Sequence, residues 1–167
     1  MTDTPIVPTV VPHGSHRLPA VDVDSYNVEL KDNEGFIGDR ASKGAFRNMI
    51  DRIRQSVRKS GDDPLGEEAS DELSKAELDS ILQQGEPEAA ALIHAAIEDF
   101  SQELALIIQR FLKLKEWKNT ERIVIGGGFR ASRIGELVTG RTTLILKSQK
   151  IDVDLCPFEI IPMKPVF

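Results

Sequence analysis

The sequence contains a single cysteine, Cys156, so no disulfide can form within the chain. Cysteine-rich zinc sites are excluded for the same reason. Histidine is also scarce, and although His13 and His16 are three residues apart, no third ligand lies near them in the sequence. A polar loop is therefore the preferred interpretation of this pair, and we predict no metal site. Cys156 lies in an apolar stretch, where a small buried hydrophobe is expected.

No apolar run is long enough to span a membrane, so we expect no membrane association. The N-terminus lacks the basic region and the apolar core of a secretory signal, which makes the cytoplasm the expected location. The net charge of −6 disfavours general affinity for nucleic acid. The content of 29% charged and 40% hydrophobic residues is typical of a globular protein. A length of 167 residues suffices for one domain, or for one domain and a fragment of another.

The N-terminal 20 residues contain four prolines, which predict an extended arm because proline removes a backbone donor and fixes φ. Apolar and polar residues then alternate over residues 21–30, which predicts a strand with one solvated face. Asp22 and Asp24 lie on one side of it. Paired carboxylates can hold Mg²⁺ or act in acid–base catalysis, but on a solvated strand face we interpret them as surface charge.

The spacing of apolar residues predicts helices over residues 40–59, 74–84 and 87–115. Ser74 and Glu77 form the pattern of a capping box at the start of the second helix, and Gly85 ends it. Residues 61–73 are acidic and are expected to form a surface loop. The first helix is expected to have a basic, solvated outer face with Arg47, Arg52, Arg54, Arg58 and Lys59.

Pro87 is expected in the first turn of the longest helix. The apolar stripe of this helix is wide, and we expect it to pack across a sheet. His94 lies in the stripe and is interpreted as a partly buried histidine rather than a catalytic one. Trp117 is expected to anchor the chain by packing where it turns back after this helix.

The stretch Glu121–Arg130 contains the most informative pattern in the chain. Ile123–Ile125 form a short apolar run, Gly126, Gly127 and Gly128 follow, and helical spacing over residues 131–149 leads into alternation over 151–155. This order predicts two parallel strands joined by a right-handed helical crossover. Glycines allow a backbone to approach a ligand, and a helix N-terminus beyond them offers free N–H groups to an anion. A purely structural connector is the alternative.

From Pro87 to about Pro157, the chain resembles the C-terminal half of the ROK-family sugar kinases (repressor, open reading frame, kinase), which belong to the actin-like ATPase superfamily. The resemblance is carried by the end of the long helix, Leu104-Ala-Leu-Ile-Ile-Gln-Arg-Phe-Leu112, and by Arg122-Ile-Val-Ile-Gly-Gly-Gly-Phe129. It implies an α/β fold, namely a partial actin-like ATPase (ribonuclease H-like) lobe. In that lobe Gly126, Gly127 and Gly128 would line the base and ribose of ATP or ADP, bound with Mg²⁺, and Phe129 would lie nearby.

The family's phosphate-binding Asp-Gly-Gly run, its catalytic aspartate segment and its cysteine-rich zinc loop are absent from the sequence. Phosphoryl transfer needs these parts together, so we predict no catalytic residue and no sugar phosphorylation by the chain alone. The expected function is the adenosine-binding side of an ATP cleft. The family's repressors carry a helix-turn-helix, but the helix over 40–59 has no partner helix at turn spacing, so DNA binding is not expected.

The chain also resembles a circularly permuted bacterial subgroup, in which the nucleotide half comes first and the phosphate half would follow residue 167. Residues 158–167 fit the family poorly. One permitted choice of codons for them, read in a shifted frame, gives Arg-Asn-His-Pro-Asp-Glu-Ala-Gly-Leu, whose ending matches the family at this place. We therefore hypothesise a frameshift that truncated the chain, which sequencing of the gene would test.

Three regions follow from these patterns: an arm and strand over 1–40, a helical insertion with an acidic loop over 41–86, and an incomplete nucleotide-side lobe over 87–167. A missing lobe would expose apolar surface, so the expected partners are a nucleotide and either a second copy or a complementary kinase lobe. The alternative is a non-catalytic protein-interaction module, which would use the helices and the acidic loop and in which the glycine turn is only structural.

Overall fold

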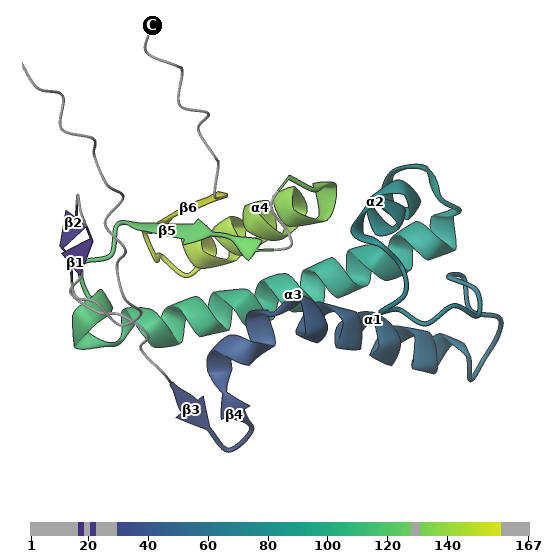
Figure 1. Ribbon diagram of the computed structural model, residues 1–167, viewed down its shortest axis with the longest axis horizontal. Helices are drawn as coiled ribbons and strands as arrows, with labels where there is room; N and C mark the ends of the chain where they lie inside the picture. Colours follow the sequence, from purple (N-terminus) through teal and green to yellow (C-terminus); the bar gives the residue numbers. More distant parts are fainter. Residues whose placement is uncertain (1–16, 19–20, 23–29, 128–130, 158–167) are drawn as a thin grey trace, which may run out of the picture.

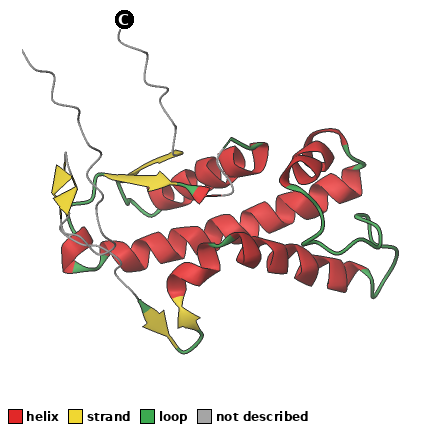
Figure 2. Cartoon of the chain, viewed as in Figure 1, coloured by secondary structure: helices red, strands yellow, loops and turns green. Residues whose placement is uncertain are grey.

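The computed structural model describes residues 17–18, 21–22, 30–127 and 131–157. The helices in these residues dominate the architecture (Figure 2). They are α1 (Lys43–Val57), α2 (Lys75–Gln84), α3 (Pro87–Leu112), α4 (Arg133–Ser148), and the short 3₁₀ helices η1 (Ile37–Ala41) and η2 (Lys115–Trp117).

The strands are short and form three separate pairs within the described residues. Two pairs are antiparallel: β1 (Arg17–Leu18) with β2 (Val21–Asp22), and β3 (Lys31–Asp32) with β4 (Gly35–Phe36). The third pair, β5 (Arg122–Ile125) with β6 (Asp154–Pro157), is parallel. Of the strand predicted over residues 21–30, only its start is seen as β2, and residues 23–29 lie outside the described residues.

The 26-residue helix α3 is the axis of the molecule and is about 39 Å long. Figure 1 shows α1 along one side of it and α4 with the β5–β6 pair along the other, while α2 lies near its N-terminal end. The helix begins with Pro87, as predicted, and ends at Leu112, three residues before the predicted end. The rings of Phe111 and Trp117 then pack against each other at a tilt of 41° with centroids 4.8 Å apart, which confirms Trp117 as a packing anchor.

Two hydrophobic clusters share α3. The larger one joins α1, α2, α3 and the first half of α4, and its members include Phe46, Ile50, Leu78, Ile93 and Val138. The smaller one joins the second half of α3 to α4 and the parallel strands through Ala105, Ile108, Leu146, Val153 and Leu155. The prediction that α3 packs across a sheet is therefore wrong for its N-terminal half, which packs among helices. A wide apolar stripe requires a partner, but it does not distinguish a helix from a sheet.

Local helix signals are confirmed in α2. The Ser74 side chain accepts from the backbone N–H of Glu77 at 3.1 Å, and Glu77 accepts from the N–H of Ser74 at 2.6 Å, which completes the capping box. The helix ends where Gly85 follows it. A Cβ at Gly85 would lie 2.5 Å from the carbonyl oxygen of Ile81, so this position accepts only glycine without a backbone shift.

The prediction of a basic, solvated outer face on the helix over residues 40–59 is wrong for two of its five residues, and Arg58 and Lys59 follow the end of α1. Arg54 is 2% exposed and Arg47 is 6% exposed. Arg47 donates through Nη2 to the carbonyl oxygen of Leu73; its buried Nη1 has no hydrogen-bond partner in the part of the chain that the structure describes. Both arginines are covered because the chain after α1 folds back over the helix and supplies acceptors. The loop over 61–73 is mostly exposed, as predicted, although Ser70 and Leu73 are buried.

The order strand, glycine turn, helix, strand is confirmed as β5, Gly126–Gly127, α4 and β6, and the strands are parallel with Arg122 opposite Asp154 and Val124 opposite Cys156. The second strand begins at Asp154, three residues after the predicted start. Cys156 is only half-buried, in contrast to the buried position expected. The fold is thus α/β, with helices and a small parallel sheet. No helix in the described part combines the length and apolar character needed to cross a membrane.

Candidate functional site

The glycine turn begins at the carboxyl end of β5. Gly126 and Gly127 follow Ile125 directly and are exposed. Gly127 has φ of +80°, and a Cβ built there would have no atom of the described residues within 4 Å. Bare backbone is therefore open to a ligand at the strand end where parallel α/β sheets bind ligands. Gly128 and Phe129, the other two predicted site residues, lie outside the described residues.

The N-terminus of α4 is already occupied by groups of the chain itself. The Ser132 hydroxyl accepts from the N–H of Gly135 at 3.0 Å. The two carboxylate oxygens of Asp79, which lies on α2, accept from the N–H groups of Arg133 and Ile134, each at 3.0 Å. The expectation that this helix start offers free N–H groups to an anion is therefore wrong for these three donors. A carboxylate at a helix N-terminus interacts favourably with the helix dipole, as a bound phosphate would.

Sequence reasoning missed Asp79 because it is 54 residues from Arg133. Its position on an ordinary amphipathic helix gives no local indication of a capping role. The only related sequence feature is Ser132, which precedes the helical spacing and is a favoured N-cap residue.

His94 is held by polar contacts at the junction of α3 and α4. Arg141 donates to the carbonyl oxygen of His94 at 3.1 Å, and its second amino group lies 3.3 Å from Nδ1 of the same residue. Arg141 also forms an ion pair with Glu98 at 3.2 Å. His94 is half-buried and has a partner, in agreement with its interpretation as a structural histidine.

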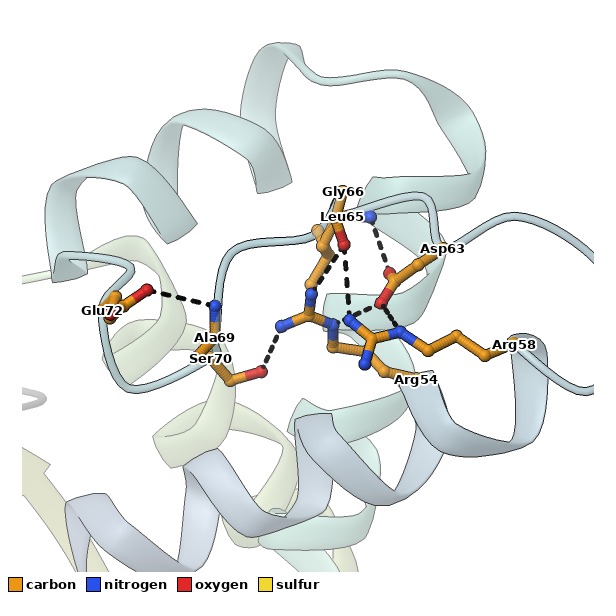
Figure 3. Close-up of polar contacts among 8 residues, drawn as sticks. All are labelled: Arg54, Arg58, Asp63, Leu65, Gly66, Ala69, Ser70 and Glu72. Atoms are coloured by element: carbon orange, nitrogen blue, oxygen red, sulfur yellow. Dashed lines mark hydrogen bonds and ion pairs between the residues drawn. The ribbon is translucent and has the colours of Figure 1, made fainter.

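A second polar cluster, centred on Arg54, holds the loop that follows α1 (Figure 3). The guanidinium donates to Asp63 at 2.7 Å, to the Ser70 hydroxyl at 2.8 Å and to the Gly66 carbonyl at 2.9 Å. Asp63 also accepts from Arg58 at 2.7 Å. Burial raises the pKa of Asp63, but the hydrogen bonds from Arg54 and from the N–H of Leu65, with the charges of Arg54 and Arg58, outweigh it and lower the pKa overall. Because its donors and acceptors are paired within the chain, the cluster is a clamp rather than an open binding site.

A third cluster ties the β3–β4 hairpin to α3. Asp32 accepts from Arg110 of α3 at 2.6 Å, from the backbone N–H of Glu34 at 3.0 Å, and from Arg40. The hydrogen bond from Arg110 is the largest of the effects that lower the pKa of Asp32 from 3.8 to about 2. Arg40 also pairs with Glu103 of α3 at 3.5 Å.

The described residues contain no group of three or more His, Cys, Asp or Glu side chains that could hold a metal ion. The predicted polar loop with His13 and His16 lies outside them, as does Asp24, the second carboxylate of the pair with Asp22. A surface hollow beside η2 is lined by Lys115, Glu116, Asn119 and Thr120. It precedes β5 and therefore lies at the amino end of that strand, opposite the glycines.

Comparisons of the chain with models of protein families, with curated proteins and with solved structures find no match to it.

Proposed function

We propose that the chain is a fragment or relative of a ROK-like sugar kinase that supplies the adenosine-binding side of an ATP cleft. The lobe would be part of an actin-like ATPase fold, and it would not phosphorylate a sugar by itself. Gly126, Gly127 and Gly128 would contact the base and ribose of ATP or ADP, with Phe129 beside them. The observation that carries the proposal is the exposed, side-chain-free backbone at the carboxyl end of a parallel strand.

The occupied start of α4 limits what this site would bind. Asp79 takes two of the N–H groups that a phosphate would use, and Ser132 takes a third. A phosphate placed there would lose these donors and meet the charge of Asp79. The binding energy would therefore come from the adenosine part of the ligand. Half of a cleft leaves the ligand partly solvated, so we expect a dissociation constant of about 1 mM.

Calorimetric titration of the whole chain with ATP, ADP and adenosine tests the proposal. Mg²⁺ is present throughout. We expect similar, weak affinities for the three ligands, because their shared part makes the contacts. Gly127→Val should abolish binding, since a branched side chain would occupy the approach to the backbone. Binding that needs the phosphates, or no binding at millimolar concentrations, would refute the adenosine site.

Gly66→Val is the matched control. Gly66 has φ of +77°, close to that of Gly127, and a Cβ built there also meets no described atom within 4 Å. It lies in the loop after α1, away from β5. Both substitutions therefore impose the same kind of backbone strain, and only Gly127→Val should affect the nucleotide. Equal loss of binding in the two variants would indicate general unfolding instead of a local contact.

The second candidate is a non-catalytic interaction module in which the glycine turn is structural. The observation that favours it is the internal cap on α4, because Asp79 gives this helix start a structural role without any ligand. Under this proposal Gly127→Val would leave partner binding intact.

A further inference from the structure

An apolar side chain on the outward face of α4 is exposed instead of packed into the core. Leu144 is 68% exposed, the largest value among the exposed large hydrophobic side chains that the structure describes. The opposite face of the helix is anchored in the core through Ile134, Val138 and Leu146. One turn before Leu144, Gly140 is exposed, and a Cβ built there would meet no atom within 4 Å in the part of the chain that the structure describes. A projecting side chain and an open position therefore adjoin on one face.

Charged residues flank this pair on both sides. Glu136 lies one turn before Gly140, its side chain is 65% exposed, and Lys147 lies one turn after Leu144 and is also exposed. The spacings of three and four residues place all four positions on the same helix face. Glu136 accepts from Arg133 through one carboxylate oxygen at 2.8 Å, and its other oxygen can still accept a hydrogen bond.

The pattern of charges, glycine and leucine on this face is complementary to the same pattern on a second, antiparallel α4 helix. Glu136 and Lys147 are equally far along the chain from the midpoint between Arg141 and Thr142, and Gly140 and Leu144 are nearly so. Two α4 helices packed antiparallel about a two-fold axis at this midpoint would place each Glu136 opposite Lys147 of the second copy. Each Leu144 would then lie over Gly140 of the second copy. Such an isologous contact requires this self-matching pattern.

We propose that this face of α4 is the surface through which two copies of the chain associate. The absence of a side chain at Gly140 would allow the helix axes to approach to about 8 Å. The charges favour a second copy over a partner with a uniformly charged surface, because Glu136 and Lys147 have opposite signs and lie at matching positions, with Arg133 paired to Glu136 on the same face. A single helix contributes a small interface, so we expect a dissociation constant in the micromolar range. The proposal does not depend on nucleotide binding, and neither result decides the other.

Sedimentation equilibrium of the full chain over a range of concentrations tests the association. Leu144→Glu should weaken the dimer by at least about tenfold, because it buries two like charges near the axis. The matched control is Leu106→Glu, since Leu106 is 51% exposed on α3, outside the proposed face. We expect this control to leave the dimer unchanged. A monomer at all concentrations, or equal weakening by both variants, would overturn the proposal.

A charge exchange tests the two-fold arrangement itself. Glu136→Lys leaves only positive charges on the face, and Lys147→Glu gives the face two carboxylates in addition to Arg133. Two copies of either variant would set like charges opposite each other, so each variant alone should be monomeric. An equimolar mixture should restore a dimer with one copy of each, because both ion pairs then form between unlike copies. Circular dichroism should show that both variants keep the helical content of the unmodified chain. If both variants are folded but fail to associate on mixing, this face of α4 is excluded as the dimer interface.

Discussion

Replacing Arg54 with methionine would remove the guanidinium that holds the loop after α1 against the helix. Three hydrogen bonds would be lost, to Asp63, Ser70 and Gly66. Asp63, whose side chain is 6% exposed, would keep Arg58 and the N–H of Leu65 as donors. Removing one member of a buried ion pair costs about 3–5 kcal/mol, and we expect the lower end, about 3 kcal/mol, because Asp63 is not left alone.

Urea denaturation followed by circular dichroism would measure this loss. The midpoint should fall by about 1–2 M, given the usual dependence of unfolding free energy on urea. Arg54→Lys should also destabilise, since one ammonium group cannot reach acceptors arranged for a fork. Arg52→Met is the matched control, because Arg52 is exposed on the same helix, and its effect should stay within about 0.5 kcal/mol. Equal midpoints for Arg54→Met and Arg52→Met would refute the reasoning.

The ion pair between Arg54 and Asp63 also predicts that the free energy of unfolding depends on pH. The pKa of Asp63 is lowered from 3.8 in the folded chain, so its contribution to stability is present above that value and is lost as the pH falls through the lowered pKa. The difference in unfolding free energy between the unmodified chain and Arg54→Met should therefore be largest near neutral pH and shrink in acid. A difference that stays constant down to the acid transition would contradict the role assigned to Asp63.

Two further predictions concern the other polar clusters. Asp79→Ala should lower the free energy of unfolding by about 1–2 kcal/mol, because two N–H groups at the start of α4 lose their acceptor. Ser80→Ala, which alters an exposed position of α2, is the control and should change the unfolding free energy little in the same denaturation assay. The pKa of Asp32 is lowered from 3.8 to about 2, so the chemical shift of the Asp32 carboxyl carbon should stay constant above pH 4 and change as the pH falls toward 2. Asp32→Asn should remove this transition, and an Asp32 carboxyl that titrates near pH 6 would disprove the assignment.

The features that the sequence predicted well are those that depend on neighbouring residues. The capping box of Ser74 and Glu77, Pro87 in the first turn of α3, and the strand–glycine–helix order around Gly126 all involve groups within a few positions of one another. Their physical basis is backbone geometry and local hydrogen bonding, which a short window of sequence contains.

The features that it missed depend on residues that are far apart along the chain. Charge alone placed Arg47 and Arg54 in solvent, whereas their partners lie 9 to 26 residues further on and bring them into the interior. The N–H groups at the start of α4 were expected to be free because no nearby residue in the sequence was expected to accept from them. Asp79 reaches them only because α2 packs beside α4. Helical periodicity predicted that α3 needs partners but not which elements provide them.

The separation of the core into two clusters has a consequence for synthesis on the ribosome. The members of the larger cluster end at Val138, so the helical core can assemble once that residue has left the exit tunnel. The smaller cluster needs Leu155 of β6, because a parallel partner reaches β5 only after the α4 crossover. Since chains emerge from the N-terminus at about 5–20 residues per second, the helical core precedes the sheet. The backbone leading into Gly126 and Gly127 would therefore be the last part of the described structure to gain its neighbours.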